Sequence, residues 1–583
     1  MTATTAPARL VWAPPSEVPQ EKLDALLGPG APFEMQEEDV LGVRMPVFVR
    51  RQRSLWDLLT SAAERFPDRP YVVFPESRHT FREILGPVAA AARVLRDEYG
   101  IGKGDRVAIA SANCVEYVIA FWATTALGAV TVALNGWWTP PELRHGIELT
   151  SPKVVLADAR RLERIEQIEG GLEMPAVPLE GDWWRAGEQP GDGSADAVPV
   201  NPVDEDDPYL VLFTSGTTGR PKGALLSHRG NLHFIQSSIL SGALNALAVP
   251  AASQEVREAQ EKQPPPVVIS ASPMFHIAGM NSQIVMAPVT GMTIVYPPQG
   301  RWQESVHLQL SEEHQVTNWS LVPAQLWRLV DWPDLHKYDL SSLRNIGGGS
   351  SIWPPELLRR AREVLPGAKA EIRLGYGMTE TNGLGTSLGP PLTYSHPESV
   401  GRPSAAVEVE VRDPATGDAV GEGVTGEVCL RTAASLICYW DNPEATASAL
   451  DEQRWYRTGD FGYIRDGLLF LEGRRHDLII RGGENIYPAE IENRLVEHPD
   501  IAEVAVVGVD HPRLGQEVKA FIVPARDRTL TEQEVRDWAG AALASFKVPA
   551  HVQFMQSLPR NAMGKVLRAQ LLDPAATATF VEE

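Results

Sequence analysis

The segment TSGTTGRPKG, from Thr214 to Gly223, combines the residue types that bind a phosphate group. Its three glycines let backbone N–H groups turn toward an anion, its four hydroxyls donate hydrogen bonds, and Lys222 adds a mobile positive charge. It differs from a Walker A loop, because the glycine spacing is shorter and Gly223 stands where Ser or Thr should follow the lysine. We predict a nucleotide phosphate loop rather than a Gly/Thr-rich surface turn, with binding residues Thr214, Ser215, Gly216, Thr217, Thr218, Gly219 and Lys222.

Three glycine-containing loops lie directly after segments that we predict to be strands. Tyr209–Phe213 precedes the phosphate loop and has the continuous apolar character of a strand buried on both faces. Leu343–Ile346 runs into GGGSS, and Glu371–Leu374 runs into GYGMTE. Because ligands bind beyond the carboxyl ends of strands in open α/β sheets, we expect the three loops to build one site.

The second and third loops carry groups that suit a nucleotide. Bare glycine backbone lets a flat base approach closely, and Tyr376 is able to stack on that base. Thr379 is placed to bond a phosphate oxygen, and Glu380 to hold Mg²⁺. Taken alone, Glu380 is equally well explained as a solvated carboxylate at a helix start.

Two other positions have both a functional and a structural interpretation. Asp460, in YRTGD, is able to accept both hydroxyl hydrogens of a ribose, although an aspartate in a turn is a common structural residue. PMFHIAG resembles an acid-pocket motif, which would make His276 the wall of a pocket rather than an acid–base group, although a lone histidine is more often structural.

Together these stretches resemble the motifs of the adenylate-forming superfamily, acyl-CoA synthetase branch. That superfamily contains acyl-CoA synthetases, aryl-CoA ligases, peptide-synthetase adenylation domains and firefly luciferase. The resemblance covers about residues 50 to 570 in roughly seven ordered motifs. GYGMTE resembles the adenine and metal motif, whereas Gly349-Ser350-Ser351 departs from the commoner Gly-Ala-Pro.

The resemblance implies roles for named residues. It implies ATP or AMP binding by the phosphate-loop residues and by Gly349, Ser350, Ser351, Tyr376, Gly377, Met378, Thr379, Asp460 and Arg474. It implies metal binding by Glu380 and Thr218. It implies an acyl pocket lined by His276, Gly279, Met280, Gly347, Gly348 and Gly375.

The C-terminal motifs imply a moving domain. RRHD, residues 474–477, resembles the hinge motif, but His476 stands where Asp or Lys is usual, which makes domain rotation a candidate for pH sensitivity. RGGENIYPAEIE follows, and its Gly482 and Gly483 are expected to line a CoA tunnel. PRNAMGKVLR resembles the catalytic-lysine motif, so the catalytic set is Lys565, Thr379, Glu380 and His276.

The reaction implied is an acid–CoA ligation that uses ATP, Mg²⁺ and coenzyme A, with a fatty, bulky alicyclic or aromatic carboxylic acid as substrate. One alternative is an acyl-AMP ligase that passes the acyl group to a carrier protein, and another is a luciferase-like oxygenase. A third is a serine hydrolase, because GTSLG around Ser387 matches a nucleophile elbow; no apolar strand immediately precedes it.

The elements that position these groups form an α/β architecture. We expect a large N-terminal domain of two α/β subdomains plus a β-rich subdomain over about 400–472, with a small mobile α+β C-terminal domain. The expected divisions are an irregular N-terminal extension over 1–53, the adenylation domain over 54–475 and a lid domain over 476–583. Residues 182–207 read as a linker, 250–266 as an exposed insertion, and the capping box at Thr531 as a helix start.

Composition agrees with a cytoplasmic enzyme. The 53 basic and 75 acidic residues give a net charge of −22, which argues against a nucleic-acid partner. Three scattered cysteines indicate a reducing compartment, and the N-terminus lacks the apolar core of a signal peptide. The uncharged run Tyr117–Leu134 is expected to be a buried helix and strand rather than a membrane span. The oligomeric state is left open, a homodimer among the options.

Overall fold

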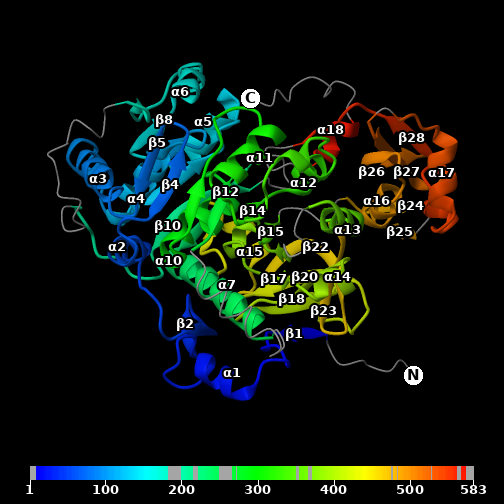
Figure 1. Cartoon of the computed structure of the whole chain (residues 1–583), viewed down its shortest axis with the longest axis horizontal. Coiled ribbons are helices and arrows are strands. Elements are labelled where there is room, and N and C mark those ends of the chain that lie inside the picture. The colour runs from blue at the N-terminus through cyan, green and yellow to red at the C-terminus, as the bar shows by residue number, and fades with distance from the viewer. Residues whose placement is uncertain are drawn as a thin grey trace.

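The computed structural model describes residues 8–181, 198–214, 221–248, 265–270, 272–349, 353–365, 371–474, 477–481, 484–526, 528–560 and 566–572. The chain forms a large α/β body and a small C-terminal domain. Figure 1 shows the small domain in orange and red at the right edge, against the green and yellow elements of the body. The predicted fold class is confirmed.

The phosphate-loop strand lies inside a seven-stranded sheet. Strand β10 (Pro208–Thr214) runs parallel to β7 (Val130–Leu134) and antiparallel to β11 (Lys222–Ser227). The side chains of Tyr209 to Phe213 are all buried, as the apolar run predicts. The order of this sheet is β21-β11-β10-β7-β6-β8-β9, completed by β21 (Cys438–Tyr439), β6 (Arg106–Ala110), β8 (Val154–Ala157) and β9 (Ala176–Pro178).

The other two nucleotide loops follow neighbouring strands of a second, fourteen-stranded sheet. β15 (Asn345–Gly348) ends at the glycine loop and pairs in parallel with β16 (Glu371–Tyr376), which ends at GYGMTE. The observed β15 begins two residues after the predicted strand, because Leu343 is a core residue in the turn before it. The α/β half of this sheet is completed by β14 (Asn318–Ser320), β12 (Val267–Ser270), β13 (Thr293–Val295), β4 (Pro70–Phe74) and β5 (Ser77–Thr80).

The β-rich region predicted over about 400–472 forms the antiparallel half of the same sheet. Its long hairpin joins β22 (Tyr456–Arg465) to β23 (Leu468–Arg474) and carries both Asp460 and Arg474, which are register partners. The half is completed by β17 (Thr386–Leu388), β18 (Ser399–Pro403), β20 (Gly426–Arg431), β19 (Glu408–Arg412) and β1 (Arg9–Val11).

Helices cover both faces of the sheets. α2 (Leu55–Arg65) starts at a capping box in which Ser54 accepts from the Asp57 N–H, and it packs on α4 (Val115–Ala126). Helix α4 and strand β7 occupy the uncharged run Tyr117–Leu134, so the expected buried helix and strand are confirmed. Further helices are α3 (Leu85–Tyr99), α5 (Pro140–Thr150), α6 (Ala159–Glu166), α7 (His228–Ala248), α11 (Glu304–Glu313), α12 (Pro323–Val330), α13 (Pro355–Val364) and α15 (Pro443–Ala449).

Residues 8–53 are not the irregular extension that the sequence suggested. They contain β1, α1 (Gln20–Leu27) and the hairpin of β2 (Met35–Val40) with β3 (Val43–Phe48). β1 extends the large sheet by pairing with β19, while Val18 and Phe48 pack against Leu240 and Leu244 of α7. The segment is therefore part of the body, and contacts with distant segments add to its own helix and hairpin.

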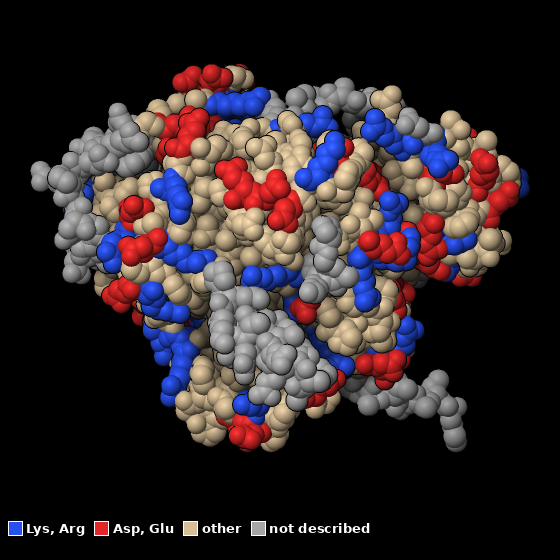
Figure 2. All heavy atoms as spheres, in the orientation of Figure 1, with Lys and Arg blue, Asp and Glu red and all other residues tan. Residues whose placement is uncertain are grey.

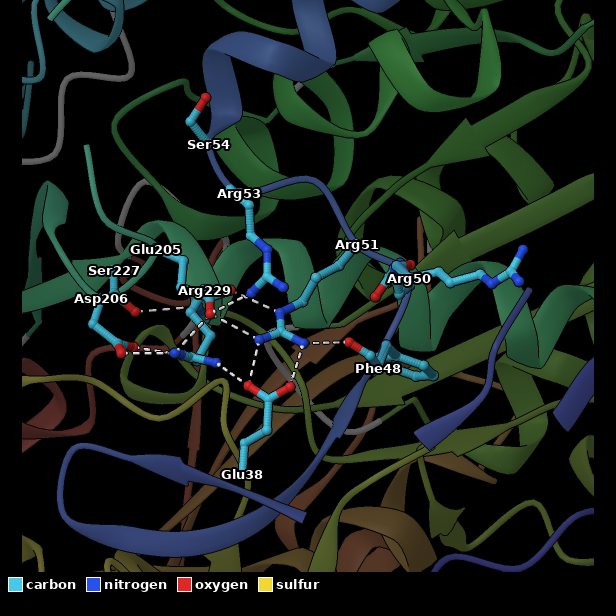
Figure 3. Close-up of polar contacts among 12 residues, drawn as sticks. Glu38, Phe48, Arg50, Arg51, Arg53, Ser54, Glu205, Asp206, Ser227 and Arg229 are labelled. Atoms are coloured by element: carbon cyan, nitrogen blue, oxygen red, sulfur yellow. Dashed lines mark hydrogen bonds and ion pairs between the residues drawn. The ribbon is translucent and has the colours of Figure 1, made fainter. Parts of the chain in front are cut away.

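An ion-pair network fixes this segment to the start of α7 (Figure 3). Arg51, whose side chain is 1% exposed, donates to Glu205 from Nε at 2.7 Å and to Glu38 from Nη2 at 2.7 Å. Arg229 of α7 pairs with Glu205 at 2.8 Å and with Asp206 at 2.5 Å. Glu38 lies between both arginines, and hydrogen bonding to Arg51 lowers the pKa of its carboxyl to about 2.

The C-terminal domain is a small α+β unit. Its sheet contains β25 (Glu484–Ile486), β24 (Ile479–Arg481), β27 (Gly515–Pro524), β26 (Ile501–His511) and β28 (His551–Phe554). Helices α16 (Pro488–Val496), α17 (Glu532–Gly540) and α18 (Arg568–Leu572) complete it. α17 starts at the predicted capping box, in which Thr531 accepts from the Glu534 N–H.

The surface carries charge of both signs. Figure 2 shows acidic and basic side chains interspersed over one face, with no continuous basic stripe over the described atoms in view. None of the helices that the structure describes is long and apolar enough to span a lipid bilayer.

Candidate active site

A cavity of about 590 Å³ lies between the body and the C-terminal domain. Tyr376 and Asp460 line it from the body, together with Arg474 at the end of β23. The C-terminal domain contributes Arg560 and Arg568 to the opposite wall. Its size is that of an ordinary small-molecule site, and it lies where β16 ends, at the edge predicted for ligand binding.

A cluster of hydrogen-bonded side chains in this cavity is centred on Asp460. The Tyr376 hydroxyl donates to its Oδ2 at 2.8 Å, and Arg474 donates to its Oδ1 from Nε at 3.0 Å. Thr458 holds the backbone, because the Asp460 N–H donates to the Thr458 Oγ1 at 3.0 Å. Burial and the Asp460 charge raise the pKa of Tyr376 well above its usual value. Burial works to lower the pKa of Arg474, but Asp460, Tyr376 and Glu380 together raise it, so the arginine is a fixed cation.

Glu380 is buried rather than solvated. It lies in the short 3₁₀ turn η6 (Thr379–Thr381) that follows β16, and its residue is 7% exposed. The Tyr439 hydroxyl donates to its Oε1 at 2.8 Å and lies 3.2 Å from the Tyr456 hydroxyl. The interpretation of Glu380 as a free surface carboxylate is therefore wrong, because this carboxylate is held in one orientation by a buried phenol.

The two ends of the phosphate loop are fixed by strand pairing. Thr214, the last residue of β10, faces Lys222, the first residue of β11, across an antiparallel pair. Residues 215–220, which include Ser215, Gly216, Thr217, Thr218 and Gly219, lie outside the described residues. The Lys222 ammonium lies 5.4 Å from the centre of the Tyr439 ring, so the lysine and Glu380 approach the same tyrosine from two sheets.

Tyr439 and Tyr456 were absent from the residues predicted from sequence. Neither lies in a recognisable motif loop of its own, although Tyr456 opens the YRTGD stretch that contains Asp460. Tyr439 reaches the site only because β21 pairs with β11, a contact between segments far apart in the chain. A tyrosine at the edge of a two-residue strand carries no local signal that predicts this pairing.

The three glycines at the end of β15, Gly347 to Gly349, differ in how much space surrounds them. A Cβ on Gly348 would lie 2.2 Å from the Trp353 ring and 2.3 Å from the Leu321 carbonyl oxygen, so this position needs glycine for packing. A Cβ on Gly347 would meet nothing closer than 3.7 Å, and one on Gly349 nothing closer than 3.3 Å. Gly375 and Gly377 line the cavity, whereas Ser350 and Ser351 lie outside the described residues.

The segment expected to border the acid is closely packed. His276 is half-buried and packs against Phe275, with ring centres 4.9 Å apart; its Nε2 atom is buried and has no hydrogen-bond partner among the described residues. Burial lowers its pKa to about 4, so the imidazole is neutral. A Cβ on Gly279 would lie 2.2 Å from the Pro273 carbonyl oxygen, and Met280 is fully buried. None of these three lines the cavity, and Gly375 alone of the expected acyl-pocket residues does so.

Three predicted C-terminal positions lie outside the described residues: His476, the pair Gly482 and Gly483, and Lys565. Their neighbours are placed nonetheless. Arg560 and Val566 form an antiparallel bridge that closes the 561–565 segment, and both residues line the cavity. Arg481 and Glu484 are register partners at the end of the β24–β25 hairpin, and neither lines the cavity.

Ser387 does not lie in a nucleophile elbow. It is the middle residue of β17 and pairs with Gly375 on one side and Arg402 on the other. An elbow requires a sharp turn from a strand into a helix. The hydrolase interpretation is therefore wrong.

The comparisons with known proteins agree with this geometry. Residues 59–440 match the family model of AMP-binding enzymes, and residues 490–565 match that of the AMP-binding enzyme C-terminal domain. Since the first match spans well over half of the chain, the protein belongs to the AMP-binding enzyme family, the adenylate-forming enzymes.

Individual relatives cover nearly the whole chain. An indoleacetate–CoA ligase from Aromatoleum aromaticum is 34% identical over 525 residues, which are 89% of this chain and 97% of the relative. A 4-coumarate–CoA ligase from Oryza sativa is 31% identical over 87% of this chain and 90% of the relative. The structure of an o-succinylbenzoate CoA synthetase from Bacillus subtilis, in complex with its acyl-adenylate intermediate, matches with a TM-score of 0.74 at 28% identity, covering 90% of this chain and 99% of that one.

Proposed function

We propose that the protein is an acid–CoA ligase that works in two steps. A carboxylic acid and ATP first give an acyl-adenylate and pyrophosphate; the thiol of CoA then takes the acyl group and AMP leaves. The observation that carries the proposal is the hydrogen-bonded cluster of Tyr376, Asp460 and Arg474 on the cavity wall. Lys222, at the end of the phosphate loop, adds to it by lying against Tyr439, the tyrosine that donates to Glu380.

The nucleoside is assigned to the Asp460 cluster. Each carboxylate oxygen of Asp460 already accepts one hydrogen bond and keeps a second lone pair, so both remain able to accept from the two hydroxyls of a ribose. The hydrogen bond from Tyr376 to Asp460 fixes the orientation of the tyrosine ring, on which adenine stacks. Gly349, Gly377 and Met378 supply the backbone around the base, with Ser350 and Ser351 assigned from the motif.

The phosphates are assigned to Lys222, Thr379 and the 214–219 segment. The oxygen set offered here suits Mg²⁺, which is typically held by one or two carboxylates together with substrate phosphates. Glu380 meets this requirement, since Tyr439 occupies only Oε1. Glu380, together with Thr218, would hold Mg²⁺, which would neutralise phosphate charge.

Lys565 is assigned to the adenylation step. A carboxylate oxygen of the acid bonds to the α-phosphorus as the bond to the β-phosphate oxygen breaks, and pyrophosphate carries away the electron pair. The reacting groups need positioning and charge stabilisation rather than covalent help from the protein. Arg560 and Val566, the described residues on either side of Lys565 in the sequence, both line the cavity, which supports this role.

Thioester formation is assigned to a second arrangement of the C-terminal domain. Rotation about His476 withdraws Lys565 and brings Gly482 and Gly483 to the cavity, where the CoA thiol attacks the acyl carbonyl and AMP departs. Arg481 and Glu484, which flank these glycines, do not line the cavity, and this supports a separate arrangement for this step. The division into an adenylation domain ending near residue 475 and a lid domain beginning at His476 belongs to the same proposal.

The acid is assigned to the apolar side of the site. His276 stays neutral at ordinary pH, so it suits the wall of a pocket for an uncharged acyl group rather than an acid–base role. The named relatives act on indoleacetate and 4-coumarate, and a further relative from Bacillus subtilis, 29% identical, is a long-chain-fatty-acid–CoA ligase. We therefore propose an arylacetic, hydroxycinnamic or fatty acid as the substrate class.

A panel of carboxylic acids tests the proposal. Purified protein is incubated with Mg·ATP and each acid, and pyrophosphate is measured without CoA and then with CoA, alongside mass spectrometry of the acyl product. We expect one acid class to release pyrophosphate and to give a thioester only with CoA. Pyrophosphate without thioester would mean that the acyl acceptor is a carrier protein or an amine. An amide bond synthetase from Marinactinospora thermotolerans has a similar structure, with a TM-score of 0.75 at 26% identity over 89% of this chain and 99% of that one.

The same proposal includes a cytoplasmic location and a homodimer. The three cysteines are unpaired, which supports a reducing compartment. Light scattering on the 63.8 kDa chain tests the assembly, and fractionation of the source cells tests the location.

A further inference from the structure

Four polar side chains form a fully buried network beneath the turn that carries Glu380. They are Tyr209, Asn231, Asn281 and Asn382, and each is 0% exposed; we call them the amide network. The Asn231 Nδ2 donates to the Tyr209 hydroxyl at 2.7 Å. That hydroxyl lies 3.1 Å from the Asn281 Oδ1 and 3.4 Å from the Asn382 Oδ1. Four segments far apart in the sequence therefore meet at one phenol.

Asn382 connects the network to the Glu380 turn. It caps η6 with a φ of +53°, a left-handed conformation that asparagine tolerates better than most residues. Its N–H donates to the Thr379 carbonyl oxygen at 3.1 Å, and its Nδ2 donates to the Ala434 carbonyl oxygen at 2.8 Å. The side chain thus fixes the end of the turn from below.

Asn281 connects the network to the segment assigned to the acid. It lies in the π-helical turn η4 (Met280–Val285), which directly follows the PMFHIAG stretch. Its Nδ2 donates to the Asn382 carbonyl oxygen at 3.1 Å and lies 3.2 Å from the Asn382 Oδ1. Single π turns inside helices occur often at functional sites, and this one aims an amide at the Glu380 turn.

Tyr209 connects the network to the phosphate loop. It lies near the start of β10, and Thr214 ends the same strand where the loop begins. A rigid strand therefore separates the network from the phosphate-loop residues by a fixed length. An apolar cluster would fill this space at similar stability, but hydrogen bonds specify one arrangement of the four segments.

We propose that the amide network is a positioning device that holds Glu380 and Thr379 at a fixed place relative to the end of β10, with Tyr209 and Asn281 as its positioning residues. This inference rests on the proposed function, because it assigns the network to the geometry of Mg·ATP. None of the four residues lines the cavity, so the network acts through the η6 turn. Its loss displaces Glu380 and so weakens metal-dependent binding more than binding of AMP.

Two substitutions test the network, and a third serves as the matched control. Tyr209→Phe removes the central hydroxyl, and Asn281→Ala removes the donor to Asn382. Tyr117→Phe deletes an equally buried hydroxyl in α4 that has no hydrogen-bond partner. Equilibrium dissociation constants are measured by calorimetry for Mg·ATP and, in EDTA, for AMP, and folding is checked by thermal unfolding.

We expect Tyr209→Phe and Asn281→Ala each to raise the Kd of Mg·ATP about tenfold, the effect of one buried hydrogen bond, and to change the Kd of AMP less than about twofold. Tyr117→Phe leaves both constants unchanged. Equal weakening of both ligands, or no change in either with folded protein, overturns the network proposal. Wild-type protein that binds neither ligand overturns the proposed function instead, so the two failures are distinguishable.

Discussion

Arg51 offers the sharpest stability test, because a matched control lies two residues away. Its side chain is 1% exposed and bonds to Glu38, Glu205 and the Phe48 carbonyl oxygen, whereas that of Arg53 is 58% exposed and pairs only with Glu205 (Figure 3). Removing one partner of a buried ion pair costs ~3–5 kcal/mol, because the other charge stays buried without compensation. Removing an exposed partner costs at most ~1 kcal/mol.

We therefore expect Arg51→Ala to lower the free energy of unfolding by about 3–5 kcal/mol, and Arg53→Ala by less than about 1 kcal/mol. Arg51→Lys should fall between them, since an ammonium keeps the charge but loses the forked geometry. The measurement is urea unfolding followed by near-ultraviolet circular dichroism, comparing midpoints within the same transition. Equal effects of Arg51→Ala and Arg53→Ala would refute the account of the N-terminal segment as a buried part of the body.

Three further predictions follow from the site and its surroundings. Asp460→Asn keeps the shape of the side chain but loses the charge between Tyr376 and Arg474. We expect the Kd of AMP to rise by roughly 10- to 100-fold, which corresponds to the ~1.5–3 kcal/mol of a charged hydrogen bond. Calorimetry measures this Kd, and an unchanged value would remove Asp460 from the ribose site. The lowered pKa of Glu38 stabilises the fold above pH 4.5, and this stabilisation is lost as the pH falls toward about 2. Acidification from pH 6 to 3 should therefore lower the free energy of unfolding of wild type more than that of Glu38→Gln. An equal loss in the two proteins would contradict this. Because the pKa of His276 is about 4, its imidazole does not titrate between pH 5.5 and 8, and the pH profile of pyrophosphate release should have the same shape in His276→Gln. If His476 gates the second step, only thioester formation changes with pH, and His476→Asp flattens the pH profile of thioester formation.

The sequence predicts the site where the signal is local. An apolar run followed by glycines and hydroxyls is enough to place a buried strand and its loop, as at Tyr209–Phe213, because both depend on neighbouring residues. The sequence assigned Asp460 and Arg474 to the same ligand by resemblance, and the structure adds that they are register partners in one hairpin.

The features that the sequence did not predict depend on non-local contacts. Tyr439 meets Glu380 only through the pairing of β21 with β11, and Arg51 is buried only because the 205–206 segment and α7 meet it. Residues 8–53 looked irregular because their elements are short and β1 pairs with a strand far along the chain, although β2 and β3 pair with each other. A pattern of residue types along the chain does not record which distant segment supplies the second half of an ion pair.

The central claim, that an acid becomes an acyl-adenylate before it becomes a thioester, is tested most directly with an acid labelled with ¹⁸O in its carboxylate. If the carboxylate oxygen bonds to the α-phosphorus, one labelled oxygen stays with AMP after the thiol takes the acyl group. Mass spectrometry of the AMP formed during thioester synthesis should therefore show one ¹⁸O per molecule. Unlabelled AMP, or label found in phosphate with ADP as the nucleotide product, would contradict the account.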